Sequence, residues 1–85
     1  MEILINKMDN LMSSNLKDII AGAYKYKDNR KERIIYIQER MEQNYPKILW
    51  SVLIYTDGNS SVKYSDTYYF SCEFRNDTII IFGNK

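Results

Sequence analysis

Apolar and polar positions alternate along the second half of the chain in the way that β-strands require. Residues 48–55, 68–74 and 78–82 are rich in Ile, Val, Leu, Tyr and Phe, and clusters of Asp, Asn, Ser and Thr separate them. Between residues 68 and 74 the period is two. One face carries Tyr68, Phe70, Cys72 and Phe74, and the other carries Tyr69, Ser71 and Glu73. These runs predict three strands joined by turns, and Arg75, Asn76 and Asp77 should close a hairpin between the last two, since Asn and Asp tolerate left-handed backbone.

A fourth run, residues 60–64, has strand character but few apolar residues to hold it in a sheet. Val62 and Tyr64 alone supply its apolar face. Burial stabilises such a strand poorly. We therefore expect it to lie at a sheet edge and to pair with a strand of another chain, which is called β-augmentation. An ordinary edge strand kept soluble by Lys63 is the alternative.

The first half of the chain has helical spacing instead. A helix is predicted from Ser14 or Asn15, either of which can cap its first turn, to Tyr26. The preceding Asp9 and Asn10 favour a turn. The buried face of this helix follows the spacing i, i+3, i+4, i+7 and consists of Leu16, Ile19, Ile20 and Ala23.

A second helix is predicted after a short link. Asn29 and Glu32 have the spacing of a capping box, and Pro46 ends the helix because proline cannot continue a helical backbone. Its apolar stripe consists of Ile34, Ile37, Met41 and Tyr45. Because the link is short, the two helices should pack side by side.

Residues 2–6 form a further β-branched run, so the predicted order of elements is β-α-α-β-β-β-β. Helices and strands that are segregated in this way predict the α+β class, with two helices packed on an antiparallel sheet. A chain of 85 residues is long enough for one domain and too short for two, so residues 1–85 should form a single domain.

The composition excludes most catalytic chemistry. The chain has no His and one Cys, Cys72, so one chain cannot build an internal disulfide, a Cys/His zinc site, or a Ser-His or Cys-His pair. Cys72 shares its face with Phe70 and Phe74, which indicates an inert core thiol. No glycine-rich phosphate loop is present. We therefore expect no enzymatic activity, no metal and no cofactor.

The net charge of +1 gives no overall field that favours nucleic acid or membrane. The densest charged stretch, residues 25–33, mixes basic and acidic residues with Tyr26. A solvated corner between the helices is the simpler interpretation, and a small RNA-binding domain is the alternative. The N-terminus lacks the pattern of a signal peptide, and no run approaches the ~18 apolar residues of a membrane span. We expect a cytoplasmic protein.

Three blocks of sequence carry a family resemblance. Residues 45–54 read Tyr-Pro-Lys-Ile-Leu-Trp-Ser-Val-Leu-Ile, residues 60–64 read Ser-Ser-Val-Lys-Tyr, and residues 78–85 read Thr-Ile-Ile-Ile-Phe-Gly-Asn-Lys. Together they resemble the eight-kilodalton dynein light chains, whose pattern aligns without a gap from Trp50 to the end. The helical half is similar in order and length, with a somewhat shorter link between the helices.

This resemblance implies a strand-exchanged homodimer with two grooves at its interface, each of which accepts an extended peptide as an added strand. The dimer-interface positions correspond to Ser51, Leu53, Tyr55, Ser60, Val62 and Tyr64. The peptide-binding positions correspond to Asn59, Ser60, Ser61, Val62, Lys63 and Tyr64 on the thin strand, Tyr69, Ser71 and Glu73 on the groove floor, and Arg30 and Lys31 at the start of the second helix.

The function that the resemblance implies is that of a non-catalytic dynein light chain, a cytoplasmic and cytoskeletal hub in a microtubule-associated dynein complex. The implied partners are the tail of a dynein intermediate or heavy chain and other proteins with extended linear motifs, without nucleic acid or membrane. A monomeric structural subunit of a motor complex, with a degenerate groove, is the alternative.

The sequence departs from the family pattern inside the groove. Ser71 and Glu73 replace two tyrosines of the groove floor, and Gly58 and Ser61 replace two aromatic residues of the thin strand. We therefore expect a wetter and more acidic groove in which Glu73 favours peptides that carry Lys or Arg. Ser51 stands where the family has an interface histidine, so a dimer that dissociates on histidine protonation is not expected.

Overall fold

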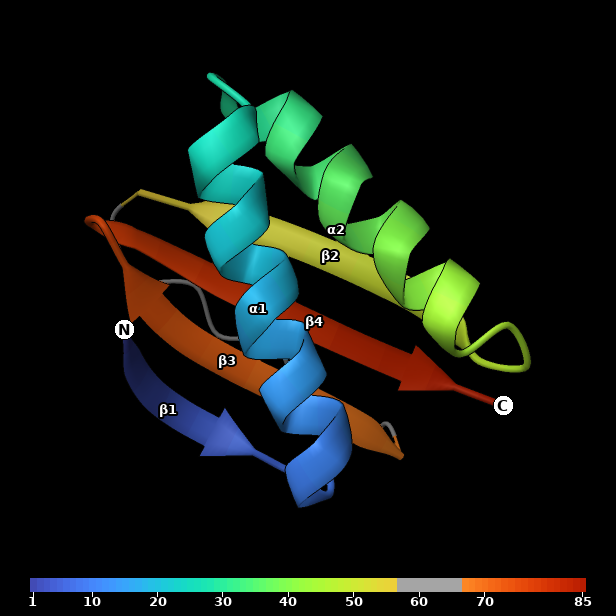
Figure 1. Ribbon diagram of the computed structural model, residues 1–85. Coiled ribbons are helices and arrows are strands. Elements are labelled where there is room, and N and C mark those ends of the chain that lie inside the picture. Colours follow the sequence, from blue (N-terminus) through green and yellow to red (C-terminus); the bar gives the residue numbers. More distant parts are fainter. Residues whose placement is uncertain (57–66) are drawn as a thin grey trace.

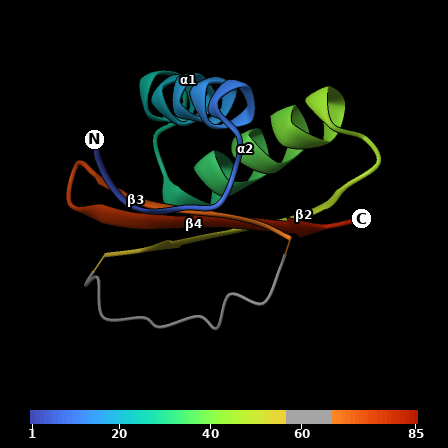
Figure 2. The ribbon, with the colours of Figure 1, turned by 90° about the horizontal axis from the view of Figure 1, so that it is seen from below.

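Two helices cover one face of a four-stranded antiparallel sheet (Figures 1 and 2). The computed structural model describes residues 1–56 and 67–85. The elements are β1 (Glu2–Asn6), α1 (Asn10–Tyr26), α2 (Arg30–Asn44), β2 (Leu49–Tyr55), β3 (Tyr68–Phe74) and β4 (Asp77–Asn84). The predicted α+β class, with two helices on an antiparallel sheet, is confirmed. The strand predicted at residues 60–64 lies outside the described residues.

The strand order β1-β3-β4-β2 places the β3–β4 hairpin at the centre of the sheet and an earlier strand at each edge. β4 pairs with both β2 and β3. Ile79 and Ile81 belong to the core between sheet and helices, whereas Ile80 points to the other face, and none of the three is more than 2% exposed. A strand with neighbours on both sides and both faces buried has a continuous apolar sequence, as the run in β4 predicted.

The two edge strands differ in regularity. β2 pairs with β4 along all 7 of its residues without a break. β1 has 5 residues, and its register against β3 shifts between Ile3 and Ile5. The shift is the signature of a β-bulge, which locally disrupts the hydrogen-bond ladder.

The central hairpin turns through two residues with left-handed backbone. Arg75 has φ 51° and Asn76 has φ 68°, and Phe74 pairs with Asp77 on either side of them. Positive φ at both central residues defines a type I′ turn, whose twist matches that of the strands it joins. The hairpin predicted at this position is confirmed, with Asp77 as the first residue of β4.

Helix α1 begins at Asn10, so the prediction of Ser14 or Asn15 was wrong. The side chain of Asp9 caps the helix and accepts the backbone N–H of Met12 at 2.8 Å. The side chain of Met12 is buried, which extends the apolar face one turn ahead of the predicted start. The turn predicted just before the helix is this cap, since Asp favours both turns and N-cap positions.

Helix α2 begins and ends where the sequence predicted. The side chain of Asn29 accepts the backbone N–H of Glu32 at 2.9 Å, as in one half of a capping box. The helix ends at Asn44, just before Tyr45 and Pro46. Neither helix in the described part of the chain is long and apolar enough to cross a membrane.

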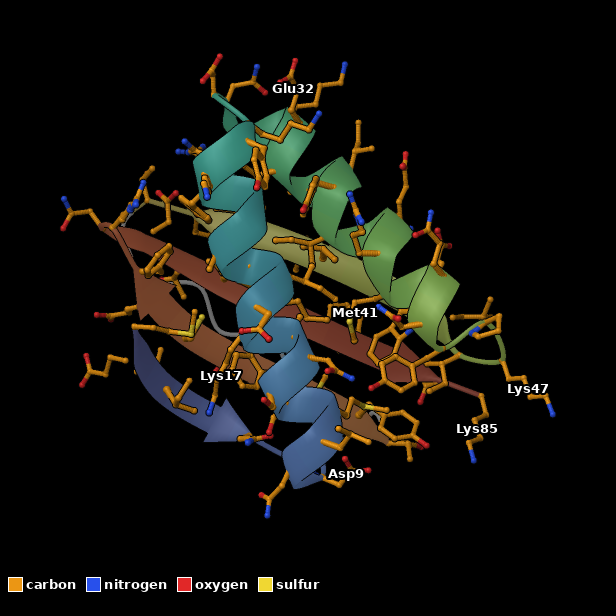
Figure 3. The ribbon with its side chains drawn as sticks, in the orientation of Figure 1. Asp9, Lys17, Glu32, Met41, Lys47 and Lys85 are labelled. Atoms are coloured by element: carbon orange, nitrogen blue, oxygen red, sulfur yellow. The ribbon has the colours of Figure 1, made fainter. Side chains whose placement is uncertain are left out.

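The core lies between the two helices and the sheet. Its fully buried large side chains come from both helices and from the sheet. In Figure 3, Met41 lies between α2 and the strands. These side chains are Leu16, Ile20, Ile37, Met41, Phe70, Cys72, Ile79 and Ile81.

Gly83 allows two aromatic rings to meet across the end of the sheet. It is paired with Trp50 on one side and Tyr68 on the other, and the two ring centroids are 5.9 Å apart. A Cβ atom on Gly83 would lie 2.6 Å from Cγ2 of Ile48 and 2.8 Å from Cε3 of Trp50. Only a residue without a Cβ atom fits here. The start of β2 therefore packs tightly against β4.

Candidate functional site

The outer edge of β2 is open in the described part of the chain. β2 pairs with β4 on one side, and no described strand pairs with its other side. In an antiparallel strand the residues alternate in the direction of their N–H and C=O groups. Every second residue of β2 therefore turns unpaired backbone groups outward, which is the chemistry that an added strand uses.

One flank of α2 faces α1. The guanidinium carbon of Arg33 lies 4.3 Å from the centroid of the Tyr24 ring on α1. The hydroxyl of Tyr36 lies 2.7 Å from the position that a Cβ atom on Gly22 would occupy. These contacts place this flank of α2 against α1.

The opposite flank of α2 faces outward on the β2 side of the molecule, because α2 packs on β2 (Figure 1). The spacing i, i+4, i+7, i+11 aligns Lys31, Ile35, Gln38 and Glu42 along this outer flank. Ile35 is 46% exposed, which is high for a large apolar residue. Lys31 was predicted as a site residue from the resemblance, and Ile35 was missed, although it is apolar and lies off the buried stripe.

The face of the sheet away from the helices carries the other predicted site residues in rows that cross the strands. The first row is Glu2, Glu73, Thr78 and Tyr55, the second is Ile5, Ser71, Ile80 and Leu53, and the third is Tyr69, Phe82 and Ser51. The predicted groove floor on β3 and the predicted dimer contacts on β2 therefore share one face. Residues of β4, which the sequence reasoning did not name, lie between them.

Solvent reaches the margin of this face and not its centre. Tyr69, Ser71 and Ile80 are 3%, 4% and 2% exposed. Glu73 and Ser51 are exposed. Of the three predicted floor residues, only Glu73 is accessible in the single chain.

Two carboxylates lie side by side at the first row. Glu2 of β1 is directly opposite Glu73 of β3 in the register, so both side chains point to the same face of the sheet. Like charges placed opposite each other repel, and a basic side chain placed between them would relieve that repulsion. The acidic character predicted for Glu73 is reinforced by this neighbour from the far end of the chain.

The remaining predicted residues stand as follows. Arg30 and Lys31 are exposed in the first turn of α2. Leu53 and Tyr55 are half-buried on the outer edge strand. Residues 59–64 lie outside the described part of the chain.

The single thiol of the chain is buried. Cys72 is 0% exposed, and burial raises the pKa of its thiol to about 11, so it carries almost no thiolate at neutral pH. The Tyr24 hydroxyl donates a hydrogen bond to Oδ2 of Asp77 at 2.6 Å. Burial first, and then this hydrogen bond, raise the pKa of Tyr24. The bond ties α1 to the central hairpin.

The sequence matches no protein family model, and no curated protein matches it either. Among solved structures, it is similar to the dynein light chain-like domain of a calcium binding protein from Fasciola hepatica. The TM-score is 0.76 at 13% identity, and the match covers 95% of this chain and 88% of that one. This chain has a dynein light chain-like fold. The resemblance predicted from the sequence is confirmed for the fold.

Proposed function

We propose that this protein is a non-catalytic, light chain-type adaptor that forms a homodimer and binds extended peptides of partner proteins by strand addition. The observation that carries the proposal is the unbroken outer edge of β2, which lies below the outer flank of α2. The dynein light chain-like fold supports a light chain-type role in general.

The proposed dimer uses the backbone of β2. A strand from the second copy pairs with the outward N–H and C=O groups, and its side chains meet Ser51, Leu53 and Tyr55 on the face away from the helices. Residues 59–64 are the proposed strand, as the resemblance implies. A small domain gains stability from such pairing because its own core is limited.

In the proposed dimer a strand of the second copy pairs with β2, and the extended peptide adds beside residues 59–64 of that strand, as the resemblance implies. A few side chains supply further contacts. Ile35 on the outer flank of α2 offers an exposed apolar contact, and Arg30 and Lys31 stand at the start of the same helix. Extended segments of dynein intermediate or heavy chains, in a microtubule-associated complex of the cytoplasm, are the proposed partners.

The test compares the two edges of the sheet with one chemical change. Leu53 and Ile5 occupy the same row at opposite edges and are both half-buried. Sedimentation at tens of micromolar should give twice the chain mass of 10.2 kDa for the wild type and for Ile5→Lys. Leu53→Lys should weaken association by roughly tenfold or more, since it buries a charge in the interface. Equal effects of the two variants would refute the proposed edge.

Peptide binding is tested separately. A partner segment captured by pull-down is synthesised with a normal backbone and with alternate peptide bonds N-methylated. Strand addition predicts that methylation of the one alternate set whose N–H groups face the protein abolishes binding, whereas methylation of the other set is tolerated. Binding that survives methylation of each set in turn would contradict the proposal.

A second candidate is a monomeric structural subunit of a motor complex. The burial of Tyr69 and Ser71 in the single chain favours it, because it closes most of the predicted groove floor. This candidate predicts a species of the single chain mass at the same concentrations and no affinity for isolated extended peptides.

A further inference from the structure

A cavity of about 340 Å³ lies where the two helices diverge. α1 and α2 are close at the link between them and spread apart toward the start of α1 (Figure 1). At the open end, Met12, Tyr45, Pro46, Ile48 and Tyr68 line the cavity. Its volume is at the lower end of the ~300–1,000 Å³ range of ligand pockets. The cavity is on the helix side of the sheet and is separate from the outer edge of β2.

The apolar wall of this cavity is held in place by hydrogen bonds and ring contacts. Nδ2 of Asn15 donates to the hydroxyl of Tyr45 at 2.9 Å, and Nε1 of Trp50 donates to the backbone oxygen of Tyr45 at 3.3 Å. The Trp50 ring lies 6.1 Å from the Tyr45 ring and 5.9 Å from the Tyr68 ring. The wall is therefore formed before any ligand arrives, which lowers the entropic cost of binding.

The charged side chains that line the cavity have one sign. Lys47 and Lys85 both line it and are both exposed, and no acidic side chain is among the described residues that line it. Figure 3 shows the two lysines at the same end of the molecule, with Lys17 on the other side of α1. An apolar wall beside two cations complements a ligand that combines an apolar body with a carboxylate.

We propose that this cavity is a second docking site, which binds a segment of a partner protein in which a bulky apolar residue adjoins one or two acidic residues. The apolar side chain enters between Tyr45 and Tyr68, and the carboxylates pair with Lys47 and Lys85. The site is separate from the strand-addition site of the proposed function, so one copy can hold two partner segments.

The experiment selects peptides from a random-sequence phage library on the intact wild-type protein and, in parallel, on the Lys47→Gln/Lys85→Gln variant. Lys17→Gln serves as a matched control for the loss of one exposed lysine. We expect Phe or Leu next to Asp or Glu to be enriched on the wild type and on the control, and not on the double variant.

Selected peptides are then titrated into the labelled protein. Amide shifts should concentrate at residues 45–48, 68 and 85, and the fluorescence of Trp50, the single tryptophan, should change. The double variant should bind roughly threefold to tenfold more weakly, the range for two solvent-exposed ion pairs. Equal binding of Asn/Gln versions of the peptides, or shifts confined to β2, would overturn the proposal.

Anionic vesicles of phosphatidylserine and phosphatidylcholine test the other possible occupant. We expect no co-sedimentation of the wild type with these vesicles. Co-sedimentation that the double variant loses and the Lys17→Gln control retains would assign the cavity to a lipid surface and overturn the proposal.

Discussion

Neither edge strand of the sheet has a described strand on its outer side, and the two edges differ in the regularity of their pairing. β1 is short, and its register against β3 shifts between Ile3 and Ile5. β2 is longer, keeps its register against β4 throughout, and has α2 above it. Bulges and short strands are devices by which proteins prevent unwanted pairing at an edge.

This difference in regularity indicates where a further strand can add. A regular edge presents its N–H and C=O groups at even intervals, so a second strand can pair along its whole length. A bulged edge interrupts those intervals. β2 is therefore the edge at which we propose strand addition, and each of the following predictions tests an aspect of this contrast.

The largest expected effect concerns how firmly each edge strand is anchored to the core. Ile54 of β2 is 6% exposed and Ile3 of β1 is 37% exposed. Ile54→Ala should lower the free energy of unfolding by about 2–5 kcal/mol, because it leaves a cavity in the core. Ile3→Ala, the same change at the other edge, should cost about 1 kcal/mol or less. Urea denaturation measures both, and similar losses would mean that the two edges are equally anchored.

The next effect is a pH dependence of folding stability that arises from Cys72, on the strand beside β1. Cys72 is paired with Ile3, and burial raises its thiol pKa from 9.0 to about 11. Between pH 9 and 11 the unfolded chain has released this proton and the folded chain has kept it, so folding stability falls as pH rises. The loss should reach about 2–3 kcal/mol above pH 11 and be absent below pH 9.

Denaturation at pH 8, 9, 10 and 11 measures this loss, with Cys72→Val as the control that lacks the thiol. The remaining slope of the control reports other groups, including Tyr24, whose pKa is also raised. If the free energy of unfolding fell equally with pH in the wild type and in the control, β1 would be opening locally and letting the thiol ionise without global unfolding.

A smaller effect is expected at the aromatic contact that fixes β2. In Gly83→Ala the new methyl group would overlap Ile48 and Trp50, and such overpacking costs about 1–3 kcal/mol. Gly22→Ala is the control. Its methyl group would meet only the movable hydroxyl end of Tyr36, and Ala gains about 1 kcal/mol of helix propensity over Gly. Thermal unfolding should therefore show a clear loss for the first variant and little change for the second.

The smallest effect concerns the acidic row that begins at β1. Glu73 and Glu2 should favour peptides with Lys or Arg, and Glu73→Gln should reduce that preference about twofold to fivefold, as expected for an exposed ion pair. A peptide array with single basic substitutions measures it, with Glu39→Gln on α2 as the control. Basic substitutions that make no difference on the wild type would remove the predicted preference.

Sequence reasoning predicted the elements that depend on local chemistry. The cap at Asn29, the stop before Pro46 and the turn at Asn76 each follow from a residue type at a fixed position, and the structure confirms them. The start of α1 was missed because Asp9 suits a turn and a cap equally well. The burial of Met12, which depends on tertiary packing, distinguishes the cap from the turn.

The candidate site was less predictable because it depends on which strands are neighbours. The period of two placed Ser71 and Glu73 on the face away from Phe70, which is correct. No local pattern reveals that β4 lies between β3 and β2, and so Ile80 was not named. The pairing of Glu2 with Glu73 joins the two ends of the chain, and only the topology provides it.

The central position of β4 has a consequence for synthesis on the ribosome. Residues 77–84 pair with β2 on one side and β3 on the other, and they are translated after every other element described here. Until those residues emerge, β3 can pair with β1, but β2 has no partner among the described strands. The sheet closes in one late step, and a nascent chain stalled before Asp77 should remain sensitive to protease throughout.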